Sequence, residues 1–418
     1  MEMIKTYTPE LRFPEFHDEW QVKRLGLIAK LYKGKGISKS EALTQGKTPC
    51  VRYGELYTYY GEAIKETKSY TNVPYNDLFL GKQNDIVMPS SGETKEDIAT
   101  ASCLMKDNIA LGGDINVIRL ENNDGLFFAY YLRNGKKNDI SKIAQGMSII
   151  HLYNEQLSNL FVSFPTFAEQ RKIALCLSSL DDLIKSVGDK IELLKQHKKG
   201  LMQKLFPKLT GKKMANPELR FPEFHEDWQH YSMETIFEMK NGYTPSKLNP
   251  DFWEKGTIPW FRMEDIRRNG YVLSDSIQHV TPDAVKNSGL FPAYSIIVAT
   301  TATIGEHALI IVDSLANQQF TFLTKRKSFN NTLDMIFFHQ YMFIIDKWCK
   351  RNTNSSGLLS VNMPAFKQLQ VSIPSIPEQR KIAECMSSLD TKIEQYESKL
   401  QQLERHKKGL MQKMFVKF

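Results

Sequence analysis

The chain repeats its own frame, and this repetition limits the folds that are open to it. Three segments occur twice, namely PELRFPEFHDEW at 9–20 and PELRFPEFHEDW at 217–228, EQRKIALCLSSLD at 169–181 and EQRKIAECMSSLD at 378–390, and HKKGLMQK at 197–204 and 406–413. The copies lie 208 or 209 residues apart, and the stretches between them barely resemble each other. A duplicated frame around two unlike inserts predicts a protein that reads two different things at a fixed separation.

Composition places the chain among ordinary globular proteins of two or three domains, with 418 residues, 41% hydrophobic and 24% charged. The net charge of +8 favours a polyanionic partner, although many soluble proteins are equally basic. None of the five cysteines forms a Cys-x-x-Cys motif, so neither a zinc site nor a dithiol is indicated. We expect a cytoplasmic protein without a membrane segment, because the sequence lacks a signal peptide and any run of roughly 18 apolar residues.

Two long helices follow from apolar residues that alternate at spacings of four and three, which is a heptad seam. The predicted seam consists of Ile173, Leu177, Leu180, Ile184, Ile191 and Leu194 in the first helix and of Ile382, Met386, Leu389, Ile393, Leu400 and Leu403 in the second. Lys198 and Lys407 break the two seams at equivalent positions. Since one apolar stripe cannot face water alone, we expect the helices to bury their seams against each other; the alternative is that each helix packs only on its neighbouring domain.

The direction of this pairing follows from charge. Each helix begins with an acidic residue, Glu169 or Glu378, and ends with a His-Lys-Lys cluster. Parallel helices would place the two basic clusters side by side, whereas antiparallel helices place each cluster near the acidic start of its partner and align the dipoles favourably. We therefore predict an antiparallel coiled coil with a pseudo-twofold axis through its middle.

The two inserts contain short β-branched runs bounded by Gly, Pro and Asn, with helical stretches between them, so we predict mixed α/β domains. The predicted boundaries are 1–165 for the first variable domain, 166–206 for the first helix, 207–375 for a basic linker (207–216) with the second variable domain, and 376–418 for the second helix. In the repeated opening segment, Phe13, Phe16 and Trp20 are expected to be buried and to pin each domain to the helices. An alternative, compatible with the first, is that this segment faces a partner subunit.

Basic, hydroxyl and aromatic residues occur at parallel places in both inserts. The candidate nucleic-acid contacts are Lys33, Lys35, Lys39, Arg52, Tyr53 and Tyr57 in the first insert and Thr244, Ser246, Lys247, Trp260, Arg262, Arg267 and Arg268 in the second. Arginine suits guanine edges and phosphates, lysine and hydroxyl side chains suit phosphates, and loop glycines allow close backbone approach. Among the residues of the second insert, Arg262 is the strongest single candidate for a nucleic-acid contact.

No catalytic or metal-binding set stands out. Gly46-Lys47-Thr48 resembles the tail of a phosphate loop, but Glu41 stands where its first glycine is required. The nine histidines show no metal-ligand spacing. The sequence therefore gives no reason to expect an enzyme or a metal site.

With these elements, the chain resembles the specificity subunits of type I restriction–modification systems over nearly its whole length. The resemblance rests on LRFPEF…W opening each half, on Pro-x-x-x-EQRKIA opening each long helix, and on Ala302–Gly305 followed by Ala316–Phe320. The first insert departs from this pattern, since Ser90–Thr94 stands where an Ala-Thr-Ile-Gly-like turn is expected.

The resemblance implies two target-recognition domains, each reading one half of a bipartite asymmetric site in double-stranded DNA. It implies helices that set the spacing and carry two adenine methyltransferase (modification) subunits, with motor–nuclease (restriction) subunits joining them. The chain itself would bind no cofactor, and its partners would use S-adenosylmethionine, ATP and Mg. The alternatives are a DNA-recognition or coiled-coil interaction module of another DNA-processing complex, and an enzyme with fused recognition domains, for which no cofactor loop is found.

Overall fold

The computed structural model describes residues 8–146, 149–207, 216–354 and 359–416, so most of the predicted linker at 207–216 lies outside the described residues. The chain forms two compact units. Unit 1 comprises Met1–Asp189 with Glu397–Phe418, and unit 2 comprises Lys190–Tyr396. Each unit therefore contains one variable domain, the start of one long helix and the end of the other.

The first variable domain contains strands and short helices in alternation. Its strands are β1 (Gln21–Arg24), β2 (Ala29–Lys33), β3 (Thr48–Val51), β4 (Ala63–Ile64), β5 (Ser69–Thr71), β6 (Leu80–Gly81), β7 (Ile86–Pro89), β8 (Ser91–Gly92), β9 (Ser102–Leu104), β10 (Ile109–Leu111), β11 (Ile115–Leu120), β12 (Ile150–His151) and β13 (Phe161–Phe164). Its helices are α1 (Tyr53–Thr58), α2 (Lys95–Ile98), α3 (Gly125–Tyr130), α4 (Lys137–Ile143) and α5 (Asn154–Ser158).

The second variable domain follows the same plan. Its strands are β14 (Gln229–Ser232), β15 (Phe237–Asn241), β16 (Ile258–Phe261), β17 (Val272–Leu273), β18 (His279–Val280), β19 (Ser295–Ala299), β20 (His307–Ile310), β21 (Leu315–Ala316), β22 (Phe320–Lys325), β23 (Thr353–Asn354), β24 (Ser360–Val361) and β25 (Gln370–Ile373). Its helices are α7 (Met233–Ile236), α8 (Met263–Asn269), α9 (Met335–Arg351) and α10 (Met363–Gln368).

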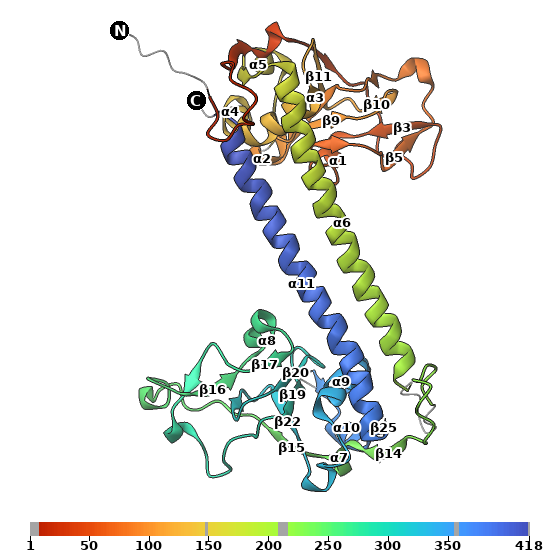
Figure 1. Cartoon of the computed structure of the whole chain (residues 1–418), viewed down its shortest axis with the longest axis vertical. Helices are drawn as coiled ribbons and strands as arrows, with labels where there is room; N and C mark the ends of the chain where they lie inside the picture. Colours follow the sequence, from red (N-terminus) through yellow and green to blue (C-terminus); the bar gives the residue numbers. More distant parts are fainter. Residues whose placement is uncertain (1–7, 147–148, 208–215, 355–358, 417–418) are drawn as a thin grey trace. The chain divides into compact units, whose positions relative to one another are not determined.

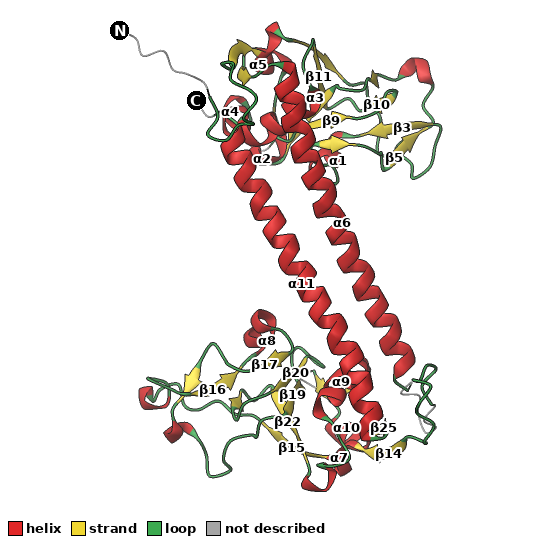
Figure 2. Ribbon diagram, in the orientation of Figure 1, coloured by secondary structure: helices red, strands yellow, loops and turns green. Residues whose placement is uncertain are grey.

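The two domains share one sheet topology despite their unlike sequences. The larger sheet has the order β2-β11-β7-β9-β4 in unit 1 and β15-β22-β19-β20-β17 in unit 2. In both, only the last pair of strands is parallel. A smaller sheet in each domain contains one parallel pair, β3 with β10 and β16 with β21. The predicted mixed α/β class is confirmed, and Figure 2 shows β3, β5 and β10 on the side of their domain away from the long helices.

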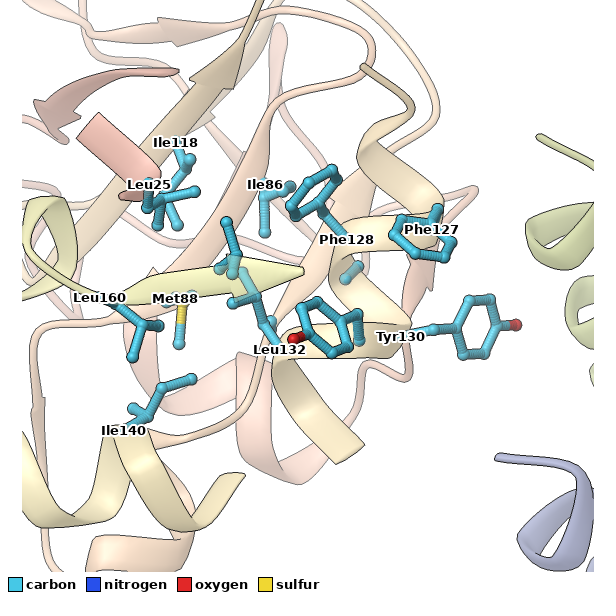
Figure 3. Packing of buried hydrophobic residues seen from close by; sticks show 14 of the residues in the cluster. Leu25, Ile86, Met88, Ile118, Phe127, Phe128, Tyr130, Leu132, Ile140 and Leu160 are labelled. Atoms are coloured by element: carbon cyan, nitrogen blue, oxygen red, sulfur yellow. The ribbon is translucent and has the colours of Figure 1, made fainter. Parts of the chain in front are cut away.

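The core of unit 1 forms between the larger sheet and α3, because Ile86 and Ile118 of the sheet belong to one buried cluster with Phe127 and Phe128 of α3 (Figure 3). Strands β7 and β19 are buried along their whole lengths, which explains why they appear in the sequence as continuous apolar runs. Asp124 caps α3 by accepting a hydrogen bond from the Phe127 amide at 2.8 Å.

The long helices are α6 (Phe167–Leu205) and α11 (Ile376–Met414), of 39 residues each. All twelve residues of the predicted seam are buried or half-buried. In unit 1 the end of α11 lies against the start of α6, where Lys407 forms an ion pair with Asp181 at 2.6 Å (Figure 1). In unit 2 Lys198, near the end of α6, forms an ion pair with Asp390, near the start of α11, at 2.5 Å. The helices are therefore antiparallel, as predicted.

These ion pairs explain the breaks in the seam. Each lysine replaces an apolar residue because an aspartate of the opposite helix lies within reach, and Lys407 also contacts the buried Glu62 at 3.3 Å. Burial alone would raise the pKa of Glu62, but Lys407 and Arg133 hold this pKa below its ordinary value. The lysines therefore pair with aspartates inside the helices, and not with the glutamates at the helix starts that the charge argument had named.

The glutamates at the helix starts bind the opening segments instead. Glu169 is fully buried and accepts two hydrogen bonds from Arg12, at 2.8 and 2.7 Å. Arg220 holds Glu378 in the same way, also at 2.8 and 2.7 Å. The opening segments therefore pin each domain to its helix, as predicted. Trp20 is buried as expected, whereas Phe13 and Phe16 are only half-buried.

The glutamine of each EQRKIA motif fixes the variable domain from the other side. Gln170 accepts from the Asp124 amide at 2.9 Å and donates to the carbonyl of Pro165 at 2.9 Å. Gln379 makes the equivalent bonds to the Asp334 amide and to Pro374, both at 2.8 Å. The Glu-Gln pair thus holds two chain segments at the start of each long helix.

The residue after each long helix completes the core of the unit in which that helix ends. Phe415 packs between Phe127 and Tyr131, with ring centroids at 5.8 and 5.5 Å, and Phe206 packs between Phe337 and Tyr341 at 5.3 and 5.1 Å. Substitution Phe415→Ala should cost about 3–5 kcal/mol of local stability, because a buried aromatic ring is lost.

Amide hydrogen exchange can measure this loss in each unit separately. We expect Phe415→Ala to accelerate exchange in α3 and leave α9 unchanged, and the matched variant Phe206→Ala to do the reverse. Equal acceleration in both helices, or in neither, would contradict the assignment of each helix end to one unit.

Candidate nucleic-acid interface

Each unit brings together a loop, a turn and one arginine near the junction of its two sheets. In unit 1 these are the loop 34–39 after β2, the turn 112–114 between β10 and β11, and Arg52 before α1; we call them the first loop cluster. In unit 2 the corresponding parts are the loop 242–247, the turn 317–319 and Arg262, which form the second loop cluster.

Equivalent backbone hydrogen bonds hold both clusters. Gly34 donates to Ile115 at 2.9 Å and Gly242 donates to Phe320 at 2.9 Å. Lys35 donates to Leu111 at 2.9 Å and Tyr243 to Ala316 at 2.8 Å, while Gly112 donates to Val51 and Asn317 to Phe261, both at 3.0 Å. These bonds show which positions of the two units are equivalent. Gly36 corresponds to Thr244, Gly113 to Gln318, and Asp114 to Gln319.

Glycine is required where the loop crosses the turn. A Cβ atom on Gly34 would lie 2.1 Å from the carbonyl oxygen of Gly112, and one on Gly242 would lie 2.3 Å from that of Ala316. Neither contact can be relieved by moving a side chain, because both obstacles are backbone atoms. The loop therefore approaches the turn as closely as two backbones allow.

Arg52 and Arg262 occupy the same position, immediately before a short helix. The Arg52 amide donates to Glu55 at 3.0 Å, and the Arg262 amide donates to Asp265 at 2.6 Å. Glu55 and Asp265 are both buried, and Asp265 also accepts from the Ile277 amide at 2.6 Å. The backbone of each arginine is thus fixed while its side chain stays half-exposed. Arg262 in addition forms an ion pair with Glu264 at 3.1 Å.

The other predicted contacts of the first insert lie on or near its loop cluster. Lys33, Lys35 and Lys39 are exposed, and Lys35 lies 3.6 Å from Asp77. Tyr53 lines a cleft in this cluster, whereas Tyr57 lies one turn further along α1, with its ring centroid 6.3 Å from that of Tyr53.

The contacts predicted in the second insert divide into two groups. Ser246 and Lys247 are exposed on the loop, and Thr244 donates to Gln318 at 2.5 Å. Arg267 and Arg268 are exposed in the last turn of α8, at the opposite end of that helix from Arg262.

Trp260 is not placed for direct contact with a ligand. Its side chain is 2% exposed and its indole N–H donates to the Tyr243 carbonyl at 2.9 Å. The Arg262 guanidinium carbon lies 5.8 Å from the centre of this ring. Trp260 therefore supports Arg262 and the loop from inside the domain.

The first loop cluster contains a cleft beside Gly36 and Gly113, whereas the second carries larger side chains at the equivalent positions. A cleft of about 510 Å³ in unit 1 is lined by Gly36, Ile37, Ser38, Glu41, Arg52, Tyr53, Gly112, Gly113 and Asp114. In unit 2 the hydrogen-bonded side chains of Thr244 and Gln318 occupy the places of Gly36 and Gly113. Sequence analysis did not predict Glu41 and Asp114 as residues of the cleft. The one sequence feature that pointed to this loop was the Ser-Lys pair at 38–39, which occurs again at 246–247.

The Ala302–Gly305 turn follows Thr300, which is bonded to the second cluster, and Ser90 takes the place of Thr300 in unit 1. Ser90 donates to the Asp114 carbonyl at 2.8 Å, as Thr300 does to the Gln319 carbonyl at 3.0 Å. The buried His307 contacts the turn, since its Nδ1 lies 3.0 Å from the Gly305 carbonyl oxygen. Burial lowers the pKa of His307 to about 4, so this ring is neutral at pH 7.

Two further features of the part of the chain that the structure describes concern metal binding and membrane insertion. These residues contain no group of three or more His, Cys, Asp or Glu side chains that could hold a metal ion. None of their helices combines the length and apolar character needed to cross a membrane.

The close backbone crossing at Gly34 can be tested by substitution. We expect Gly34→Ala to lower the free energy of unfolding of unit 1 by about 1–3 kcal/mol, because the new methyl group meets a backbone carbonyl. Gly61→Ala is the matched control, since nothing lies within 4 Å of its Cβ position. Denaturant unfolding of both variants checks this, and equal stability of the two would show that the loop can move away from the turn.

The comparisons with known proteins agree with this architecture. The model of the type I restriction modification DNA specificity domain matches residues 17–196 and 225–405. The Escherichia coli type I restriction enzyme EcoprrI specificity subunit is 48% identical over 139 residues, which is 33% of this chain and 35% of that protein. The Methanocaldococcus jannaschii type I restriction enzyme MjaVIII specificity subunit is 24% identical over 98% of this chain and 96% of its own length.

A solved structure shows the same fold over the whole chain. The type I restriction–modification system S subunit from M. genitalium superposes with a TM-score of 0.62 at 18% sequence identity, covering 98% of this chain and all of that one. The family model matches both halves of the chain and leaves out little beyond the ends and the linker. The chain therefore belongs to the type I restriction modification DNA specificity domain family.

Proposed function

We propose that this chain is the DNA-specificity subunit of a type I restriction–modification complex, in which each unit recognises one half of a bipartite, asymmetric site in double-stranded DNA. One observation carries the proposal: a single backbone frame is built twice, and it presents unlike side chains at the same places. Gly36, Gly113 and Asp114 in unit 1 correspond to Thr244, Gln318 and Gln319 in unit 2. Two units whose loop clusters differ in this way would recognise two different half-sites.

The chemistry of both clusters suits DNA. The first combines two exposed lysines, and the second one exposed lysine, with a half-exposed arginine beside a close backbone crossing. Lysines bind phosphates without regard to sequence, and an arginine held on a fixed backbone can read a guanine edge. Arg267 and Arg268 are proposed as phosphate contacts, because they lie at the far end of α8 from the second loop cluster.

The chain itself is proposed to be non-catalytic and to bind no cofactor. Two methyltransferase subunits would dock on the repeated frame, since both units present the same opening segment and helix start. Those subunits would methylate adenine with S-adenosylmethionine, and motor–nuclease subunits would use ATP and Mg. The antiparallel helices would set the distance between the half-sites.

Exchange of one variable domain tests whether the two units recognise their half-sites independently. We expect replacement of residues 25–160 by the corresponding segment of another family member to change the first half-site and leave the second intact. These limits keep β1 and β13, which pair with each other next to the start of α6. Sequencing of methylated DNA from a host that carries the hybrid gives the result. A change in both half-sites would show that the units do not read independently.

Lengthening a helix tests the proposed spacing role. Four residues inserted after Gly188 of α6 add about 6 Å of helix. Because DNA responds in whole base pairs of roughly 3.4 Å, we expect the unspecified spacer to grow by one or two base pairs with both half-sites unchanged. The matched control replaces four exposed residues of α6 without lengthening it. An unchanged spacer in a fully active insertion variant would show that the helices do not set the distance.

A further inference from the structure

The first loop cluster places a guanidinium and a carboxylate on one cleft. Arg52 and Asp114 both line it, from different elements of the domain. Within the described residues, neither side chain has an ion-pair partner. The other carboxylate of the cleft is already engaged, because Glu41 accepts from the Ser38 amide at 2.8 Å and thereby closes its own loop. Hydrogen bonds from the Ser38 hydroxyl and amide hold the pKa of Glu41 below its ordinary value.

The floor of the cleft is bare backbone. A Cβ on Gly113 would lie 3.3 Å from the backbone of Gly36, so the loop and the turn touch without intervening side chains. Arg52 and Asp114 therefore stand beside a surface that a flat polar group can approach closely. In the second cluster the Thr244–Gln318 pair fills this place, and Gln319 stands where unit 1 has Asp114.

A carboxylate decides which part of DNA fits the cleft. Asp114 is exposed and repels phosphate, so its favourable partner in a DNA groove is an amino group, above all N4 of cytosine. Arginine donates two hydrogen bonds to O6 and N7 of guanine. Together the two side chains supply the donors and the acceptor that the major-groove edge of one G·C base pair requires.

Building on the proposed function, we propose that the first loop cluster reads a G·C base pair in the first half-site. Arg52 donates to the guanine, and Asp114 accepts from the cytosine amino group. The second cluster keeps the arginine but has an amide in place of the carboxylate, so this pairing requirement is confined to the first half-site. Asp114 is thus a residue that determines specificity and adds nothing to general attraction for DNA.

Three variants test the proposal in the chain assembled with its methyltransferase subunits. The site is first identified by sequencing methylated DNA from the host, and each base pair of the first half-site is then varied in competition binding. Arg52→Lys keeps the charge but loses the two-point contact, and Asp114→Asn removes the charge at nearly constant shape. Glu121→Gln is the control, because it removes an equal charge just beyond the opposite end of β11 from Asp114.

We expect Arg52→Lys and Asp114→Asn each to reduce discrimination at one and the same G·C pair by about tenfold or more, and to leave the second half-site unaffected. Asp114→Asn should also shift the preference at the cytosine towards adenine, which an amide side chain recognises. Glu121→Gln should change neither. If Asp114→Asn reduces folding, Asp114→Gln repeats the test with the residue that unit 2 carries at this place.

Other results would overturn the proposal. Full discrimination by Arg52→Lys would make Arg52 a phosphate contact, and a uniform gain in affinity of Asp114→Asn for every duplex would show that Asp114 only repels DNA. A first half-site without a G·C pair would exclude it directly. These outcomes leave the proposed function standing, whereas that function itself fails if the wild-type complex shows no preference among duplexes.

Discussion

The buried ion pairs between Arg12 and Glu169 and between Arg220 and Glu378 are the interaction on which the architecture depends. Both carboxylates are completely buried, so each requires its arginine. Removal of one partner from a buried pair typically costs about 3–5 kcal/mol, because a charge is left without compensation. This requirement explains why the opening segment and the EQRKIA motif are repeated together, although about 157 residues separate Arg12 from Glu169. The neighbouring glutamines extend the same junction to the capping aspartates of α3 and α9.

This junction makes each unit depend on two distant parts of the chain. The opening segment and the start of one long helix are joined by the arginine–glutamate pair, and the end of the other long helix adds Phe206 or Phe415 to the core. The lysine–aspartate pairs then fix the register of the two helices inside each unit, because Lys198 and Lys407 each need an aspartate opposite them on the other helix. A charged residue in an otherwise apolar seam lowers stability and specifies one alignment, as polar residues do in coiled coils generally.

The sequence predicts the frame well because the frame is periodic and repeated. The heptad spacing located both helices, the charge distribution predicted their antiparallel direction, and the short β-branched runs predicted the mixed α/β class. It did not reveal the role of Arg12, which lies among aromatic residues and has its partner far away in the chain. The equivalence of the two loop clusters was also hidden, since it consists of backbone hydrogen bonds that unlike side chains can satisfy equally well. Trp260 was predicted as a nucleic-acid contact two residues before Arg262, but it lies in β16, which pairs with β21, and its side chain is buried.

The division between frame and loop clusters has a thermodynamic consequence. Only a few positions in each cluster are constrained by the fold: Gly34 and Gly242 by a backbone crossing, and Glu55 and Asp265 by burial. Gly36 and Thr244, or Asp114 and Gln319, can differ because the backbone hydrogen bonds that hold the loop and the turn do not involve their side chains. Surface substitutions of this kind usually alter stability by no more than about 0.5 kcal/mol, whereas one good base contact contributes about 1–3 kcal/mol of discrimination. Under the proposed function, a change of specificity on this frame therefore costs little stability, which accords with two units that share one topology and differ in their loop clusters.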